Sequence, residues 1–237
     1  MSRKSAFVLL LHTCFAVVAQ SCATTARQFS AQPTRPTLSA RFVDPRNVEL
    51  AWRSSTAGVG GWFVEFRVGD EPEFNILDIL PAERTTYVHP NVALETAFTY
   101  RVVPILGEAS NVASVASVAS VATGTATQPT SPELESEGPI DDVPGMPQPS
   151  ELKATLVSPT SVDLRWPDRA AGEEGYLVEI SASRDSGFVA CALLPQDARS
   201  FRKARLPVST SVHFRVRAFT RGPASNTVTV TAPRSIR

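Results

Sequence analysis

The sequence has too few cysteines for a disulfide framework. Three of its 237 residues are cysteine. Cys14 lies within an N-terminal apolar run and Cys22 lies just beyond it, so Cys191 is the one cysteine left for a folded domain. An intrachain disulfide is therefore excluded there. The apolar neighbours of Cys191 favour a small core-facing residue over a metal ligand or a nucleophile.

Patterns of catalytic and metal-binding residues are missing as well. The sequence has no Gly-x-Ser-x-Gly elbow and no Cys/His cluster with metal spacing. His12 lies in the apolar run, His89 precedes a proline in an expected turn, and His213 alternates onto the solvent face of an expected strand. We interpret His89 and His213 as isolated surface imidazoles. The sequence predicts a protein that is not an enzyme and binds no metal or cofactor.

Adjacent acidic residues offer no acid/base pair either. Asp141 and Asp142 lie in a proline-rich stretch, and Glu173 and Glu174 precede an expected strand. General acid/base chemistry needs a carboxyl group whose pKa has been shifted by burial or by its neighbours. We interpret the first pair as part of a linker and the second pair as part of an exposed loop.

Net charge is zero over the whole chain but not within its halves. Residues 36–125 hold 6 basic and 10 acidic residues, whereas residues 148–237 hold 13 basic and 8 acidic residues. The basic half contains a candidate patch for an anionic partner, either an envelope polyanion or the chain's own acidic stretch, with a plain solvated face as the alternative. We expect no nucleic-acid partner and no small-molecule substrate. The patch consists of Arg199, Arg202, Lys203, Arg205, Arg217 and Arg221.

The first 22 residues are typical of an export signal. Two basic residues precede an apolar run over residues 6–19, which is shorter than the roughly 20 residues that a transmembrane helix needs. The sequence Ala-Gln-Ser-Cys that ends at Cys22 resembles the bacterial lipobox, in which the leader is cut before a cysteine that carries the lipid. Ordinary small-x-small cleavage would cut the same bond. We expect a lipid anchor at Cys22 in the bacterial cell envelope, with a secreted or periplasmic protein as the alternative.

The rest of the chain contains an internal repeat, two copies of one sequence unit. A shift of 114 residues superposes two sets of residues without a gap, and self-similarity at a fixed shift indicates two copies of one structural plan. We call residues 36–125 repeat 1 and residues 148–234 repeat 2. The first set is Leu38, Ala40, Val43, Pro45, Val48, Leu50 and Trp52, and the second is Leu152, Ala154, Val157, Pro159, Val162, Leu164 and Trp166.

Each repeat consists of short strand patterns. Val48, Leu50 and Trp52 alternate with polar or small residues, as expected for a half-buried strand. The same alternation begins again at Gly61 and around Tyr100, and repeat 2 has matching patterns. No stretch after the leader has helical periodicity. We predict an all-β chain with two β-sandwiches in tandem, each of about seven strands.

Several short motifs resemble the fibronectin type III family. They are Val-x-Leu-x-Trp in an early strand, Gly-Trp or Gly-Tyr before x-Val-Glu, a mid-domain Leu-Pro, Arg-Val in a late strand, and Ser-Asn before the last strand. The resemblance implies an immunoglobulin-like sandwich that holds or binds, without chemistry of its own. The family's usual corner tyrosine is replaced by Phe98 and Val212, and the receptor-binding triplet Arg-Gly-Asp is missing.

These observations divide the chain into five parts. Prolines and carboxylates without any basic residue favour an extended chain between the repeats. We predict two sandwiches that each close their own core and a mobile linker that joins them. The parts are a signal peptide (1–22), a flexible tether (23–35), a fibronectin type III-like domain (36–125), a Pro-rich acidic linker (126–147) and a second such domain (148–234).

Two finer predictions concern strands. Glu65 and Glu179 are expected to face Arg101 and Arg215 on neighbouring strands, as outward ion pairs. Between residues 112 and 121 the triplet Val-Ala-Ser repeats, and a period of three cannot keep one face of a strand buried. We expect the first residues of this run to form an edge strand, either as a surplus expansion or as a surface for strand addition by a partner.

The sequence thus favours a non-enzymatic interaction protein of the cell envelope, with a protein or a glycan as its partner. A passive structural spacer is the first alternative. The second is an enzyme whose site would lie at the junction of the two domains.

Overall fold

The computed structural model describes residues 34–116 and 149–234. Over these ranges the protein consists of strands and loops without a helix, and the predicted all-β fold class is confirmed. Within the same ranges, no helix exists that could cross a membrane. The predictions that lie outside the described residues concern the leader 1–22 with Cys22, nearly all of the tether 23–35, and the linker 126–147.

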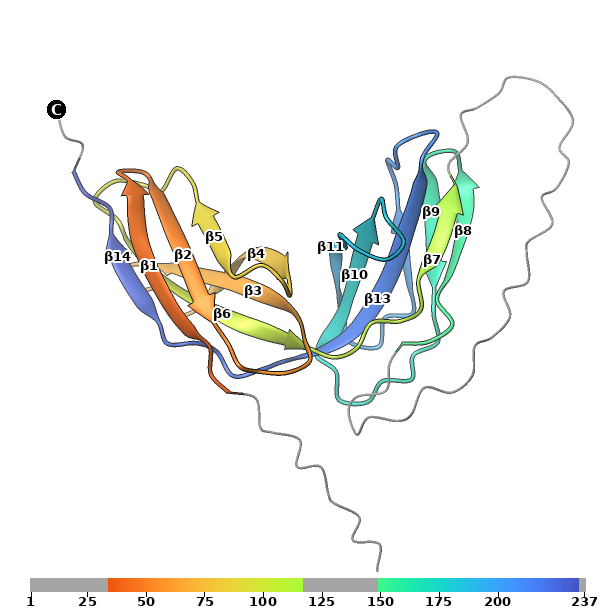
Figure 1. The fold of residues 1–237 in the computed structure, drawn as a ribbon, viewed down its shortest axis with the longest axis horizontal. Coiled ribbons are helices and arrows are strands. Elements are labelled where there is room, and N and C mark those ends of the chain that lie inside the picture. The colour runs from red at the N-terminus through yellow and green to blue at the C-terminus, as the bar shows by residue number, and fades with distance from the viewer. Residues whose placement is uncertain (1–33, 117–148, 235–237) are drawn as a thin grey trace, which may run out of the picture. The chain divides into compact units, whose positions relative to one another are not determined.

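The described residues form antiparallel strands in two groups (Figure 1). Repeat 1 forms β1 (Thr37–Asp44), β2 (Asn47–Arg53), β3 (Val59–Val68), β4 (Asn75–Pro81), β5 (Thr86–His89), β6 (Ala97–Leu106) and β7 (Ala113–Ala116). Repeat 2 forms β8 (Lys153–Ser158), β9 (Ser161–Arg165), β10 (Gly175–Ser181), β11 (Val189–Pro195), β12 (Ser200–Lys203), β13 (Ser211–Arg221) and β14 (Val228–Thr231).

Sandwich I packs two sheets around one core. One sheet has the strand order β1-β2-β5, and the other has the order β4-β3-β6-β14. Val48, Leu50 and Trp52 are buried in the core, as their alternation predicts. The Trp52 ring contacts Trp62 edge-on, with 5.9 Å between ring centroids. Core packing of this kind is the main source of stability for a sandwich, because each sheet buries one apolar face against the other.

Sandwich II repeats this arrangement. Its sheets have the strand orders β12-β9-β8 and β11-β10-β13-β7. Val162, Leu164 and Trp166 take the core positions of Val48, Leu50 and Trp52, and Trp166 packs against Tyr176 with 5.7 Å between ring centroids. The predicted fold class of two fibronectin type III-like sandwiches is therefore confirmed.

The last strand of each repeat belongs to the other repeat's sandwich. β7 of repeat 1 pairs with β13 of repeat 2, and β14 of repeat 2 pairs with β6 of repeat 1 (Figure 1). Val115 joins the core of sandwich II, and Ala232, just after β14, joins the core of sandwich I. The prediction that each repeat closes its own core is wrong. The boundaries 36–125 and 148–234 mark the repeats in the sequence, whereas each sandwich takes strands from both.

The chain passes between the sandwiches twice, and the two crossings lie where β6 and β13 end. Leu106 pairs with Thr220, and Ile105 pairs with Arg221, so the four-stranded sheets of both sandwiches join into one continuous sheet. Gly107 lies at this crossing with φ of +132°, a conformation that side chains rarely adopt. A Cβ at this position would overlap the carbonyl oxygen of Ala218. The crossing therefore requires glycine for two separate reasons.

Replacing Gly107 with alanine is expected to destabilise the protein. The backbone conformation alone should cost about 1–3 kcal/mol, and the overlap with Ala218 adds to this loss. Gly58→Ala is the matched control, because Gly58 also has a positive φ, of +69°, but has open space where a Cβ would lie. Denaturant titration of both variants measures the difference. Equal losses for the two would contradict the close crossing.

The strand exchange bears on which parts of the chain the acidic linker, residues 126–147, connects. β7 ends at Ala116 on sandwich II, and β8 begins at Lys153 on the same sandwich. The stretch that contains the linker 126–147 therefore leaves from sandwich II and returns to it. The chain passes between the sandwiches instead through residues 107–112 and 222–227, which follow β6 and β13. The linker was predicted to join the sandwiches, and this part of the prediction is wrong.

Two predictions about strands hold in part. Glu65 faces Arg101, and Glu179 faces Arg215, in the register of neighbouring strands. The first residues of the Val-Ala-Ser run form β7, an edge strand, and its partner is the other repeat of the same chain. The burial of both glutamates was not predicted, and it shapes the junction described below.

Candidate functional site

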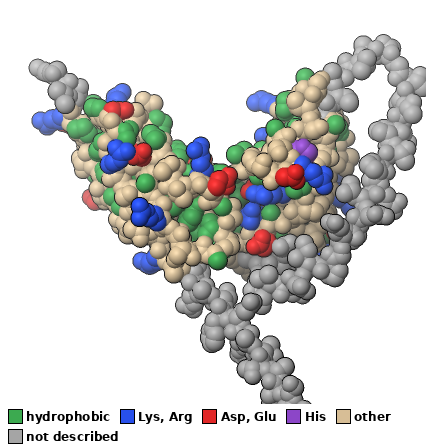
Figure 2. Space-filling view, viewed as in Figure 1, with side chains coloured by type: hydrophobic (Ala, Val, Ile, Leu, Met, Phe, Trp, Pro, Cys, Tyr) green, Lys and Arg blue, Asp and Glu red, His purple; other side chains and the backbone are tan. Residues whose placement is uncertain are grey.

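The basic residues predicted to form a patch lie on or near β12 and β13. Arg202 and Lys203 belong to β12, with Arg199 just before it and Arg205 just after it, while Arg217 and Arg221 belong to β13. On the face shown in Figure 2, basic and acidic side chains are interleaved rather than gathered by sign.

Acidic neighbours pair with the basic residues around β12. Arg202 makes a two-pronged contact with Asp163, at 2.5 and 2.7 Å, and this contact lowers the pKa of the Asp163 carboxyl group. Arg199 lies 3.8 Å from Asp168. Among the described residues, Lys203 and Arg205 have no ion-pair partner. Arg199 and Arg202 are therefore each paired with an acid of the same sandwich.

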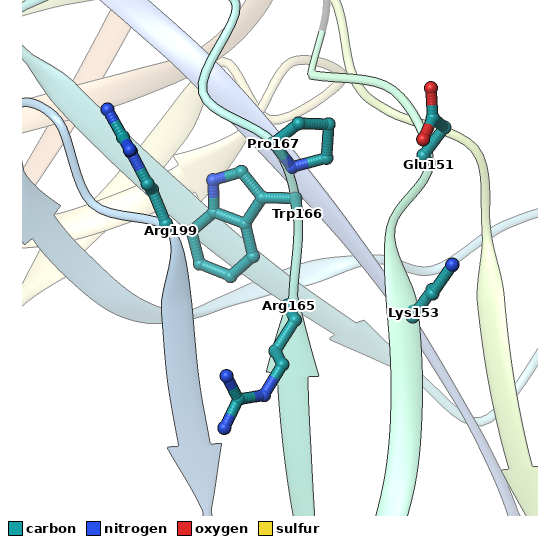
Figure 3. A pocket seen from close by; sticks show the side chains of 6 residues that line it. All are labelled: Glu151, Lys153, Arg165, Trp166, Pro167 and Arg199. Carbon is teal, nitrogen blue, oxygen red and sulfur yellow. The ribbon is translucent and has the colours of Figure 1, made fainter.

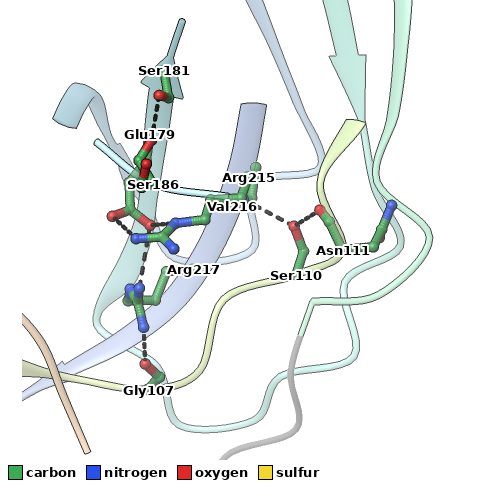
Figure 4. Close-up of polar contacts among 9 residues, drawn as sticks. All are labelled: Gly107, Ser110, Asn111, Glu179, Ser181, Ser186, Arg215, Val216 and Arg217. Atoms are coloured by element: carbon green, nitrogen blue, oxygen red, sulfur yellow. Dashed lines mark hydrogen bonds and ion pairs between the residues drawn. The ribbon is translucent and has the colours of Figure 1, made fainter. Parts of the chain in front are cut away.

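Arg217 and Arg221 face the junction of the two sandwiches. Arg217 is only 6% exposed and contacts Glu179 at 3.3 Å, while its other nitrogen donates to the Gly107 carbonyl oxygen (Figure 4). Arg221 contacts Glu65 at 2.5 Å and Glu174 at 3.5 Å. Because Arg217 is buried and Arg221 is engaged by two carboxylates, neither can serve the predicted surface patch.

A buried ion-pair network is thus the main polar feature of the junction. Glu65, 1% exposed, accepts from Arg101 at 2.6 Å and from Arg221 of the other repeat. Glu179, 2% exposed, accepts from Arg215 at 2.9 Å through both carboxylate oxygens. The two glutamates are equivalent under the shift of 114 residues. Each lies on the face of its strand that points away from the sandwich core.

A third apolar cluster touches this network, with the Arg221 guanidinium 4.4 Å from the centroid of the Phe63 ring. Phe63, Val103 and Ile105 of repeat 1 pack against Leu177 and Phe219 of repeat 2. The rings of Phe63 and Phe219 meet edge-on, with 5.5 Å between centroids. Apolar burial drives association, whereas a buried ion pair repays its desolvation only with good geometry. The junction is built to hold the two repeats together, and its carboxylates are neutralised by arginines.

Three carboxylates gather at another place, at the edge of sandwich II. Oxygens of Asp168, Glu173 and Asp197 lie within 4.8 Å of one another, close enough to hold a cation. Protein groups already occupy them: the Tyr176 hydroxyl donates to Asp168 at 2.5 Å, and the Asp197 N–H donates to Glu173 at 3.2 Å. Glu173 is buried, so the expectation of an exposed loop is wrong for this residue. Glu174 is exposed but bonded to Arg221.

An open groove of about 310 Å³ lies beside Trp166 (Figure 3). Charged side chains of both signs border it, including Glu151, Lys153 and Arg199. Trp166 itself is only 3% exposed, so it offers no ring face on which a sugar or a base could stack. The groove has no set of converging polar groups that would identify a ligand.

His89 is not the isolated surface imidazole that the sequence suggested. Its Nδ1 lies 2.8 Å from the Tyr100 hydroxyl, and its ring packs against Phe66 and Phe98 with centroids 5.5 and 5.7 Å away. Burial lowers the pKa of His89 from its ordinary value of 6.5. His213 remains at the surface, where Ser114 of the exchanged β7 lies 2.7 Å from its Nδ1.

Acid should therefore destabilise the protein through His89. Its folded-state pKa is depressed, so the unfolded chain binds the proton more tightly, and stability is lost as the pH falls below the ordinary value of 6.5. Thermal midpoints between pH 8 and pH 5 measure this loss. His89→Gln keeps an acceptor for Tyr100 and should flatten the curve. A slope that survives in His89→Gln would contradict the assignment.

Cys191 packs against the core of sandwich II, as its apolar neighbours predict. Burial raises the pKa of its thiol from 9.0 to about 11. Since the thiolate is the reactive species, this shift makes the thiol a poor nucleophile at neutral pH.

Cys191 should consequently react slowly with thiol reagents in the folded protein. The pKa shift alone lowers the thiolate fraction about a hundredfold at pH 8, and burial slows access further. Alkylation rates in buffer and in denaturant, measured by mass spectrometry, provide the comparison. Equal rates in the two conditions would show that Cys191 is accessible.

Comparisons with known proteins give no family for the chain. No protein-family model matches it, and no curated protein matches it. Three similar solved structures have TM-scores too low to support a functional argument. They are the pectate lyase PelI from Erwinia chrysanthemi in complex with tetragalacturonic acid (18% identity, 31% of this chain, 24% of that chain, TM-score 0.29), a myokine (13%, 32%, 82%, 0.28) and the FN1-FN3 domains of chicken CNTN1 (17%, 86%, 69%, 0.30).

Proposed function

We propose that the chain is a non-enzymatic interaction protein of the cell envelope, in which two fibronectin type III-like sandwiches are locked into one unit. The observation that carries this proposal is the reciprocal exchange of β7 and β14. Exchange links the sandwiches through two chain crossings and an apolar cluster. The Arg221–Glu65 ion pair and the hydrogen bond from Arg217 to the Gly107 carbonyl oxygen add polar links. Such a unit can hold two binding surfaces at a fixed spacing, which two freely linked modules cannot do.

The chemistry of the described residues favours binding over catalysis. Cys191 is held as a thiol, His89 is committed to Tyr100, and the junction carboxylates are paired with arginines. An enzyme at the junction, the less favoured alternative, would need a group free to take or give a proton there. Affinity capture from envelope extract with the full chain, set against activity screening of the same preparation, tests the proposal. Catalytic turnover without any captured protein or glycan would overturn it.

A passive spacer is the second candidate; both candidates need the anchor, and the capture experiment separates them. We propose export and lipid attachment at Cys22, on the basis of the leader and the lipobox resemblance. Palmitate labelling of wild type and Cys22→Ala tests the anchor, and loss of labelling and membrane association in the variant is the expected result. A spacer would need the anchor but capture nothing, whereas an interaction protein needs both.

An anionic partner remains a narrower possibility for the surface near β12. Lys203 and the exposed Arg205 are two of the cations there without an ion-pair partner among the described residues. Binding of the full chain to an anionic glycan at low salt, compared with Lys203→Ala/Arg205→Ala, tests this surface. Deletion of residues 133–142 distinguishes an external anion from the chain's own acidic stretch, because only fold-back predicts stronger binding after the deletion.

A further inference from the structure

Each sandwich is complete only when it receives a strand from the other repeat. β7 places Val115 in the core of sandwich II, where it is 7% exposed, and pairs with β13 from Ser211 to Phe214. β14 pairs with β6 in the same way and brings the Thr229 hydroxyl within 2.8 Å of Thr99. Without the incoming strand, a sandwich would expose part of its core and an open row of backbone groups.

The incoming segment is anchored by a Ser-Asn pair. The Ser110 N–H donates to the Val216 carbonyl oxygen at 2.7 Å, and the Ser110 hydroxyl accepts from the Val216 N–H at 3.0 Å (Figure 4). Asn111 accepts from the Leu152 N–H at 2.9 Å and donates to the Leu152 carbonyl oxygen at 3.2 Å. These four bonds hold the segment that leads into β7 against β13 and against Leu152, the residue before β8.

The second crossing uses the same four bonds. Ser225 makes two bonds to Val102, at 2.9 and 3.0 Å, and Asn226 makes two bonds to Leu38, at 2.9 and 3.0 Å. Val102 and Leu38 correspond to Val216 and Leu152 under the shift of 114 residues. Both sandwiches therefore offer the same docking site to any Ser-Asn segment that is followed by a strand.

These contacts recognise a Ser-Asn segment that is followed by a strand. They are the same whether that segment comes from the same molecule or from another. We propose that a second copy of this chain is a partner, and that two molecules exchange β7 and β14 so that each sandwich is closed by a strand of the other molecule. Strand exchange between identical chains is a low-cost route to a dimer, because it reuses contacts that already exist. Within one chain the effective concentration of the strand is on the order of millimolar, so the single-chain form dominates in dilute solution. Crowding or refolding at high concentration favours the dimer.

Cysteine pairs across the exchanged strands test this proposal. The three native cysteines of the full chain are first replaced with serine. One preparation then carries Ser114→Cys, and another carries His213→Cys. These two positions lie opposite each other on β7 and β13. The two preparations are unfolded together, refolded as a mixture and oxidised. A disulfide-linked dimer is expected, and a tenfold rise in concentration should raise the ratio of dimer to monomer about tenfold while the dimer is the minor species. Ser183→Cys, in the loop after β10, replaces His213→Cys in the control mixture.

The outcomes show whether each sandwich is closed by a strand of its own repeat, of the other repeat or of a second molecule. The double variant Ser114→Cys/His213→Cys should cross-link within one chain in dilute solution, which verifies the exchange. Coupling of Ser114→Cys with Thr99→Cys instead would mean that each repeat keeps its own strand, and the proposal would fall. Mixtures that give no more dimer than the Ser183 control at any concentration would also overturn it. If the first pair impairs folding, Thr99→Cys and Thr229→Cys provide the same test on β6 and β14.

Discussion

Cleaving the chain once within residues 126–147 is expected to leave a single particle that contains both fragments. The N-terminal fragment supplies β7 to sandwich II, and the C-terminal fragment supplies β14 to sandwich I. Each sandwich therefore contains strands from both fragments after the cut. Separation would require both exchanged strands to leave their sheets, and the third apolar cluster with its ion pairs to open as well. Two independent modules on a linker would instead separate at once.

A protease recognition sequence placed between residues 133 and 142 makes this measurement direct. Denaturing electrophoresis should show two bands, while gel filtration and native mass spectrometry show one species with the mass of the uncut chain. The same digest in denaturant should release the fragments, which proves that the cut is complete. The nicked protein should also unfold at a midpoint that rises with protein concentration, because its fragments must now associate. Fragments that elute separately under native conditions would disprove the exchange.

The exchange could not be predicted from the sequence because the two repeats are too alike. Alternation at Val48, Leu50 and Trp52 predicted which residues are buried, and the repeat at a shift of 114 predicted two sandwiches. The same likeness makes the docking sites at Val102 and Val216 equivalent, so each final strand fits either sandwich. Periodicity defines the face that a strand buries. It does not define which of two equivalent partners the strand joins.

The junction was missed for a related reason. Strand register predicted that Glu65 faces Arg101, but a period of two cannot tell whether the outer face of a sheet meets water or another sheet. A signal was present in the differences between the repeats. Arg217 takes the place of Val103, and Arg221 is an extra residue before Gly222, the glycine that corresponds to Gly107. These two arginines, which break the symmetry, are the ones that contact the other repeat, and they had been assigned to a surface patch.

Replacing Glu179 with glutamine is expected to destabilise the whole unit rather than one sandwich. The Glu179 carboxylate is buried between Arg215 and Arg217, and Arg217 holds the Gly107 carbonyl at the crossing. Removing one member of a buried ion pair leaves an uncompensated charge and costs about 3–5 kcal/mol. Because the sandwiches share strands, the loss should appear in a single unfolding transition.

Denaturant titration followed by tryptophan fluorescence measures the loss. Trp52 and Trp62 report on sandwich I and Trp166 reports on sandwich II, and the variants Trp166→Phe and Trp52→Phe/Trp62→Phe separate the two signals. Asp163→Asn removes the acid from the exposed Arg202 pair and should shift the midpoint far less. Glu65→Gln, at the equivalent position, should also destabilise the unit, but less than Glu179→Gln, because Arg221 is partly exposed and keeps its contact with Glu174. Adding Arg217→Met to Glu179→Gln should recover part of the loss, since the unpaired buried charge is then gone. If the two sandwiches unfolded in separate transitions and only that of sandwich II moved, the junction would not couple the repeats.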